Sequence, residues 1–72
     1  MSNENITVRF GLRLRMLRKQ KGWTQVQMSD SLGIDRSYIS DVERGKKNVS
    51  LPTMEVIALG FEISLSKLLS RI

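Results

Sequence analysis

The chain has 72 residues, of which 40% are hydrophobic and 26% are charged, a balance typical of globular rather than disordered proteins. It contains neither cysteine nor histidine, which excludes disulfides, the commonest zinc ligands and the usual general base. Twelve Lys and Arg against seven Asp and Glu leave a net charge of +5. We therefore expect one small domain without catalytic residues, metal or cofactor, and a polyanionic partner, either nucleic acid or an anionic membrane surface.

The distribution of charge and hydrophobicity along the chain supports a cytoplasmic location. Residues 1–5 are polar and include an acid, unlike a secretory signal peptide, and no apolar run approaches the roughly 20 residues of a membrane span. Six bases and no acid lie within residues 9–21, whereas the last third of the chain is apolar and nearly neutral. That last third is typical of packing or dimerisation surface. With no nuclear-type basic tail, we expect a bacterial or phage protein.

The first predicted helix covers residues 8–21. Phe10, Leu14 and Leu17 lie at positions i, i+4 and i+7 and so share one helical face. Gly22 follows as the stop expected after basic residues in a last turn. We expect the basic side chains of this helix to form mainly a solvated face, with direct nucleic-acid contact as the less favoured alternative.

The second predicted helix begins with an explicit capping signal. Thr24 and Gln27 form a Thr-x-x-Gln capping box, and Trp23 and Met28 flank the cap as a hydrophobic staple. The staple favours core packing for Trp23 over a role as a stacking aromatic. Gly33 ends this helix, because glycine permits the positive φ of a turn.

Three further helices are predicted by the capping residues Asp35, Ser50 and Ser64. Gly45 ends the first of them. Pro52 falls in the first turn of the second, where its missing N–H costs nothing. No stretch alternates as a strand would. The expected fold class is all-α, a single domain of five short helices folded over about residues 6–70.

Residues 25–44 hold two helices of about eight residues each, joined by a short turn. This is the layout of a helix-turn-helix, whose second helix enters the major groove of DNA. Ser29 is small where that helix must approach, and Ile39 and Val42 give it an inward face. The spacing favours DNA over a membrane, because a membrane-bound helix at residues 9–21 would use the apolar face that the core needs.

Five motifs with a specific combined spacing extend the pattern over residues 9–69: GWTQ at 22–25, LGIDRSYIS at 32–40, ERGKK at 43–47, SLPT at 50–53 and SLSKLL at 64–69. Together they resemble the lambda-repressor-like helix-turn-helix family, also described as Cro/C1-type or xenobiotic-response-element-type. The chain departs from the family at Ser29, commonly Ala, and at residues 60–63, where many members carry a Leu-Gly-Val-type helix stop. Residues 35–40 and 60–63 look closer to the controller proteins of restriction–modification systems, which are small dimeric regulators.

The resemblance and the geometry of the major groove together assign two groups of DNA-contacting residues. The start and one face of the third helix reach base edges: Arg36, Ser37, Tyr38, Ser40 and Asp41. Arg36 would pair with guanine, and Asp41 would accept only from donors such as cytosine N4; the plainer alternatives are a solvated arginine and an acid that tunes orientation. The residues at the helix ends contact phosphates: Thr24, Gln25, Arg44, Lys46, Lys47 and Asn48.

The resemblance also implies a buried ion pair between Arg18 and Glu43, with a structural rather than a functional role. Residues 61–72 are expected to serve partly as core and partly as the interface of a homodimer. The predicted interface residues are Phe61, Ile63, Leu65, Leu68 and Leu69. Such a dimer would place two third helices in successive major grooves, roughly 34 Å apart, on a palindromic operator.

The predicted function is therefore a homodimeric regulator that binds double-stranded DNA, controls its own transcription and belongs with a restriction–modification system. RNA polymerase is a further candidate partner, and no membrane is expected. Two alternatives use the same fold: an antitoxin that covers a toxin and represses its own operon, and a phage repressor. No arrangement of residues in the sequence supports an enzyme.

Overall fold

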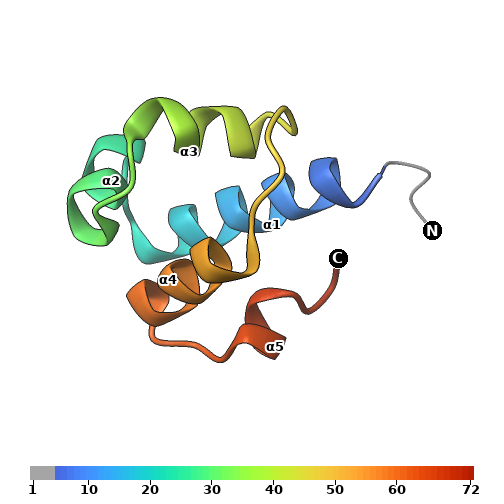
Figure 1. Cartoon of the computed structure of the whole chain (residues 1–72). Coiled ribbons are helices and arrows are strands. Elements are labelled where there is room, and N and C mark those ends of the chain that lie inside the picture. Colours follow the sequence, from blue (N-terminus) through green and yellow to red (C-terminus); the bar gives the residue numbers. More distant parts are fainter. Residues whose placement is uncertain (1–4) are drawn as a thin grey trace.

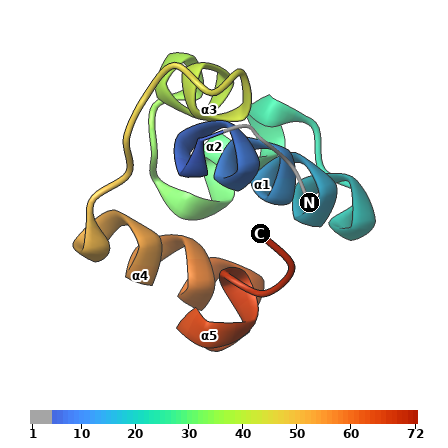
Figure 2. The ribbon, with the colours of Figure 1, turned by 90° about the vertical axis from the view of Figure 1, so that its right-hand side faces the viewer.

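A computed structural model describes residues 5–72 as five helices without a strand (Figure 1). The helices are α1 (Ile6–Lys21), α2 (Gln25–Leu32), α3 (Arg36–Glu43), α4 (Leu51–Phe61) and α5 (Leu65–Leu68). Figure 2 shows α3 on one side of α1, and α4 and α5 on the other, while α2 contacts both α3 and α4. The all-α, five-helix prediction is confirmed. None of these helices is long and apolar enough to cross a membrane.

The helix starts follow the capping signals, with one exception. The Thr24 hydroxyl accepts the Gln27 N–H at 3.0 Å, and the Gln27 side chain accepts the Thr24 N–H at 2.8 Å, so the capping box is present. Ser50 and Ser64 cap α4 and α5. Asp35 precedes α3 but makes no side-chain capping bond, and its ψ of 135° differs from the 159–169° of the other caps. Asp35 therefore occupies the predicted N-cap position of α3, but the predicted capping hydrogen bond is absent.

The ends of α1 and α2 agree with the sequence, whereas α3 ends at Glu43 with Arg44 as its C-cap, one residue before the predicted stop at Gly45. Gly22 and Gly33 end α1 and α2 with φ values of 79° and 70°. α4 ends at Phe61, and its C-cap residue Glu62 has a φ of 58°, in the left-handed region that favours glycine. α1 begins two residues before the predicted start, because the Asn5 side chain accepts the Val8 N–H at 3.0 Å.

The core draws on every helix. Each contributes a side chain that is at most 1% exposed: Leu14, Met28, Ile39, Ile57 and Leu68. Trp23 is half-buried against Phe61, with ring centroids 5.2 Å apart, so it packs against the core, as predicted. This single core fixes the positions of α2 and α3 relative to the rest of the chain.

Gly11 allows α1 to approach the end of α3. A Cβ atom at this position would lie 2.2 Å from the Val42 carbonyl oxygen and 3.0 Å from that of Glu43. Backbone atoms cannot move aside as the end of a flexible side chain does, so the packing of α1 on α3 depends on the missing side chain. Nothing in the local residue pattern around Gly11 predicts this close approach.

Two arginines of α1 hold the C-terminal segment. Arg13 is 9% exposed and donates to the Leu68 carbonyl at 3.1 Å and to the Lys67 carbonyl at 2.6 Å. Arg9 donates to the Ile72 carbonyl. The expectation of a solvated basic face is wrong for Arg13, because the free carbonyls at the end of α5 carry partial negative charge and attract a guanidinium.

Candidate nucleic-acid interface

α2 and α3 form a helix-turn-helix around the turn at residues 33–35. The Ser29 hydroxyl donates to the Ile34 carbonyl, so the serine both fits the close approach of the helices and closes the turn. Ile39 and Val42 are each 1% exposed on the inward face of α3. The inward packing leaves the opposite face of α3 free for a partner.

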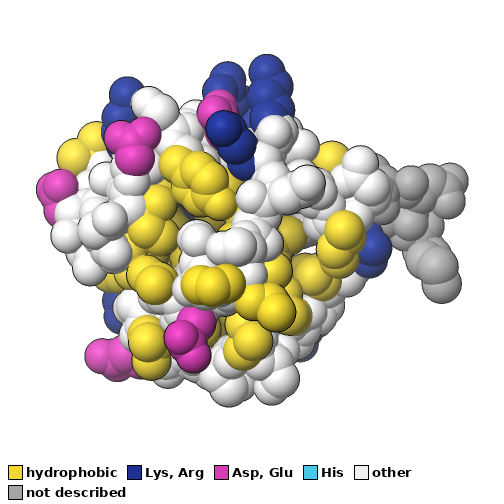
Figure 3. Space-filling model, viewed as in Figure 1, with side chains coloured by type: hydrophobic (Ala, Val, Ile, Leu, Met, Phe, Trp, Pro, Cys, Tyr) yellow, Lys and Arg dark blue, Asp and Glu magenta, His cyan; other side chains and the backbone are white. Residues whose placement is uncertain are grey.

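The outward face of α3 carries the predicted base-contacting residues. Arg36 and Ser37 are exposed at its start, and Ser40 and Asp41 lie half-buried one turn later, on the same side because residues i and i+4 are neighbours on a helix. Lys and Arg side chains gather over α3 and the following loop, at the top of Figure 3. The structure thus brings these four residues together beside a basic surface.

Tyr38 and the loop after α3 are tied together. The Tyr38 hydroxyl donates to the Asn48 carbonyl at 3.3 Å, and the Thr7 hydroxyl donates to Asn48 Oδ1 at 2.7 Å. Asn48 is therefore held by both α1 and α3. Lys46 and Lys47 beside it are exposed and form no ion pair within residues 5–72, which leaves two positive charges for an anionic partner.

Asp41 and Arg44 form an exposed ion pair, with 2.6 Å between the Asp41 Oδ1 and Arg44 Nη2 atoms. Both were predicted to contact DNA, one at bases and the other at phosphates. In the protein alone the two charges compensate each other, so Arg44 must leave or share this carboxylate to contact a phosphate. The i, i+3 spacing of the two residues was the sequence signal for this pair.

The ion pair between Arg18 and Glu43 is present and connects three segments. Arg18 Nε lies 2.7 Å from Glu43 Oε2, Nη2 donates to Oε1 at 3.0 Å, and Nη1 donates to the Trp23 carbonyl at 2.8 Å. The hydrogen bond with Glu43 raises the pKa of Arg18, although desolvation opposes it. The pair fastens the end of α3 to α1 and to the turn that precedes α2.

Glu43 also orients the start of α2. Gln25 Nε2 donates to Glu43 Oε1 at 3.2 Å. The buried Glu43 carboxylate therefore positions the Gln25 side chain, which was predicted to hold a phosphate. The Thr24 hydroxyl is engaged in the capping box. Any phosphate bound at this end would meet mainly the free N–H groups of the first turn of α2.

The predicted dimer residues divide between core and surface. Leu68 is 0% exposed and Phe61 is 8% exposed, so their assignment to an interface is wrong: the core of the same chain uses their surface. Ile63 and Leu69 are half-buried. Leu65 remains accessible, with 38% of its surface exposed.

A larger exposed apolar surface lies on α4. Leu51 and Leu59 are 67% and 71% exposed, and Leu51 borders a surface depression together with Leu65 of α5. Neither leucine was predicted to lie at the interface, because α4 is apolar on most of its circumference and its pattern does not reveal which side faces inward. Within residues 5–72, no group of three or more acidic side chains is placed to hold a metal ion.

Fold, turn and buried ion pair together define a helix-turn-helix domain of the lambda-repressor-like type. The family model described as helix-turn-helix matches residues 14–68, and the chain belongs to this family. It is 44% identical over 69 residues to the control protein C.MunI of a Mycoplasma species, an alignment that covers 94% of this chain and 93% of that protein.

Solved structures of related proteins share this fold. The restriction–modification controller protein C.AhdI from Aeromonas hydrophila matches with a TM-score of 0.81 and 44% identity, over 86% of this chain and 94% of that one. The controller protein C.Esp1396I, solved as a tetramer with its natural 35 base-pair operator, matches with a TM-score of 0.77 and 28% identity, over 92% and 97% of the two chains. The chain is therefore similar to restriction–modification controllers along nearly its whole length.

Proposed function

We propose that this chain is a transcription regulator that binds double-stranded DNA sequence-specifically as a homodimer on a palindromic operator. The observation that carries the proposal is the outward face of α3, which begins with the exposed Arg36 and lies beside the exposed Lys46 and Lys47, on a helix-turn-helix that a buried ion pair fastens to α1. The operator-bound structure of C.Esp1396I supports it, because that controller shares the fold and is a DNA-bound oligomer.

In this function α3 lies in the major groove. Arg36 at its exposed start reads guanine through O6 and N7, and Ser37 and Ser40 add weaker contacts to base edges. Lys46 and Lys47 flank the groove and bind phosphates, which supplies affinity without sequence information. The division of roles follows from position: base contacts come from the helix face and phosphate contacts from the loop that follows it.

The dimer forms through the apolar surface of α4 and α5. Leu51, Leu59 and Leu65 are exposed in the single chain, and a second copy would cover them while presenting two α3 helices on one face of the DNA. A domain of this size buries a marginal core on its own. Association therefore also stabilises the fold.

We place this regulator in the cytoplasm, without enzymatic activity or cofactor, acting on its own transcription and on that of a restriction–modification system. RNA polymerase is the partner through which a bound dimer would change transcription. The likeness to C.MunI and C.AhdI across most of each chain supports a controller rather than an antitoxin.

Selection of binding sites from random double-stranded DNA tests the proposal. We expect enrichment of a palindrome whose half-sites are centred about one helical turn, roughly 34 Å, or a multiple of it apart. A single asymmetric half-site would contradict the dimer. The absence of any enriched sequence would contradict sequence-specific binding and favour a role in binding another protein.

A further inference from the structure

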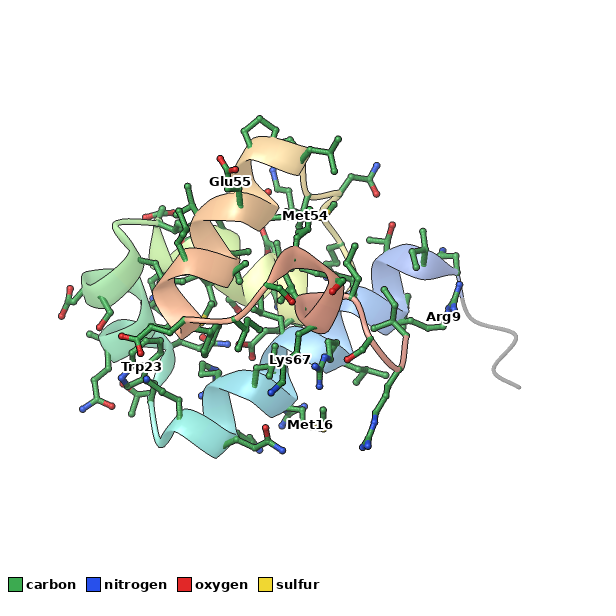
Figure 4. All side chains as sticks on the ribbon, turned by 90° about the horizontal axis from the view of Figure 1, so that it is seen from below. Arg9, Met16, Trp23, Met54, Glu55 and Lys67 are labelled. Carbon is green, nitrogen blue, oxygen red and sulfur yellow. The ribbon has the colours of Figure 1, made fainter. Side chains whose placement is uncertain are left out.

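A cavity of about 330 Å³ opens between the start of α1, the loop after α3, the first half of α4 and the C-terminal residues. In Figure 4, Met54 and Glu55 point to different sides of α4, and Arg9 lies beside the end of the chain. The cavity is of the size of a small-molecule site, for which roughly 300–1,000 Å³ is usual. Its hydrophobic lining consists of Ile6, Phe10, Val49, Met54, Leu69 and Ile72.

The polar part of the lining is small and carries one charge. Within residues 5–72, the polar residues that border the cavity are Thr7, Lys47 and Asn48. The Thr7 hydroxyl donates to Asn48 Oδ1 at 2.7 Å, so these two groups satisfy each other. Lys47 is exposed and has no ion pair within residues 5–72. Among the lining residues that the structure describes, Lys47 has the one charged side chain, so it supplies positive charge at the edge of the cavity.

We infer that this cavity binds a small anionic amphiphile, such as a medium-chain carboxylate, and that the bound molecule weakens operator binding. The hydrophobic lining would hold the apolar body, because its burial removes apolar surface from water. The ammonium group of Lys47 would select an anionic head over a neutral or cationic one. A second copy of the chain is expected on the exposed surface of Leu51 and Leu59 instead.

The effect on DNA, which rests on the proposed function, follows from Lys47. The same side chain borders the cavity and faces the phosphates in the proposed complex. An anionic head at this position would place negative charge where a phosphate must lie and would neutralise one phosphate contact. The amphiphile and the operator would thus compete for one ammonium group.

Binding is tested on the full chain without DNA, by following backbone amide chemical shifts while decanoate is added below its aggregation concentration. We expect the largest shifts at residues 6–10, 47–49 and 69–72, and weaker binding of decanol, which has the same chain without the charge. Absence of binding at millimolar decanoate would overturn the inference. So would shifts centred on Leu51 and Leu59, because they would indicate nonspecific adsorption to exposed leucines.

Two pairs of matched variants test which residues form the site. Ile6 and Leu12 are 53% and 52% exposed on the same helix, but only Ile6 borders the cavity. Ile6→Ser should weaken both ligands severalfold, and Leu12→Ser neither. Lys47→Gln should weaken decanoate about fivefold, the size of a partly exposed charge interaction, and leave decanol unchanged, whereas Lys46→Gln should change neither. Equal effects of Ile6→Ser and Leu12→Ser, or of Lys47→Gln and Lys46→Gln, would overturn the assignment of the binding site to this cavity.

The regulatory part is tested with the DNA sequence obtained by selection. Saturating decanoate should lower the operator affinity of the wild type and of Leu12→Ser severalfold, but not that of Ile6→Ser, which leaves the DNA-contacting residues intact. Unchanged operator affinity with decanoate bound would overturn the regulatory role. Failure of the chain to bind any DNA would overturn both the proposed function and the regulation, while the shift titration decides the binding site independently.

Discussion

Residues on α3 and on the loop after it are expected to contact different parts of the DNA. Arg36 is exposed at the start of the helix, and Lys47 is exposed in the loop beyond its end. An arginine against a guanine edge discriminates between bases, whereas a lysine against a phosphate does not. Removal of the two side chains is therefore expected to change DNA binding in different ways, one by lowering sequence preference and the other by lowering affinity.

Arg36→Ala should relax the base preference at one position in each half-site, at a cost of about 1–3 kcal/mol for the preferred base. Lys47→Ala should weaken all sequences alike and reduce the slope of log K against log salt by about 1 per subunit. Affinities for a panel of single-base operator variants at several salt concentrations check both. Identical profiles for the two variants would contradict the division of roles.

The Asp41–Arg44 ion pair sets a balance between specific and nonspecific binding. Its carboxylate faces a polyanion and holds Arg44 at 2.6 Å. Asp41→Asn removes a like charge and frees Arg44, so the affinity for random DNA should rise severalfold while the preference for the operator falls. Fluorescence anisotropy with operator and random duplexes measures both. Glu62→Gln makes the same charge change at the end of α4 and should alter neither the affinity for random DNA nor the operator preference. A stronger operator preference in Asp41→Asn would contradict the proposed role of the ion pair.

Replacing only one residue of the Arg18–Glu43 pair should lower the stability of the fold strongly. The two side chains are 11% and 4% exposed, and Arg18→Met would leave the Glu43 carboxylate with Gln25 as its remaining side-chain partner. We expect a loss of about 3–5 kcal/mol in the free energy of unfolding, measured in urea. The double variant Arg18→Met/Glu43→Leu should recover a large part of the loss. Strict additivity of the two single changes would mean that the residues do not interact.

Among the elements, the contact between α1 and α3 is the one that positions the recognition helix. It depends on Gly11, which faces two carbonyl oxygens of α3. Gly60 in α4 offers a matched comparison, because a Cβ there would meet the Leu32 side chain rather than backbone. The two positions therefore separate a rigid neighbour from a flexible one.

Gly11→Ala should destabilise the fold by about 1–3 kcal/mol, because the overpacking outweighs a gain in helix propensity of about 1 kcal/mol. Gly60→Ala should cost less, since the end of the Leu32 side chain can move and the propensity gain is the same. Thermal unfolding followed by circular dichroism compares them. An equal or smaller loss for Gly11→Ala would show that α1 and α3 can separate without penalty.

For the molecule as a whole, the exposed leucines of α4 and α5 decide the assembly. Leu59 is 71% exposed, so its replacement should leave the fold of one chain intact. Leu59→Lys would bring two positive charges into the proposed interface, and we expect sedimentation equilibrium to show a monomer with greatly reduced operator affinity. Leu12→Lys changes another exposed leucine, 52% exposed on α1, and this variant should remain a dimer. A dimeric Leu59→Lys variant would place the interface elsewhere.

Features that depend on near neighbours could be predicted from the residue pattern. The Thr24–Gln27 capping box and the stops at Gly22 and Gly33 involve residues within one turn of each other, so local spacing was sufficient to predict five helices and the helix-turn-helix. The pair between Arg18 and Glu43 is distant along the chain, and it was predicted only from the family resemblance. These predictions cover the fold and locate the surface proposed for DNA.

The side of each helix that faces inward follows from packing between distant segments. Leu68 is buried and Leu59 exposed, although both belong to the same apolar third of the chain. Arg13 turns to the carbonyls of α5 instead of the solvent, and Gly11 owes its role to the backbone of α3. The reason is physical: a periodic pattern identifies an apolar face, but on nearly uniform helices only packing against distant segments selects the face that is covered.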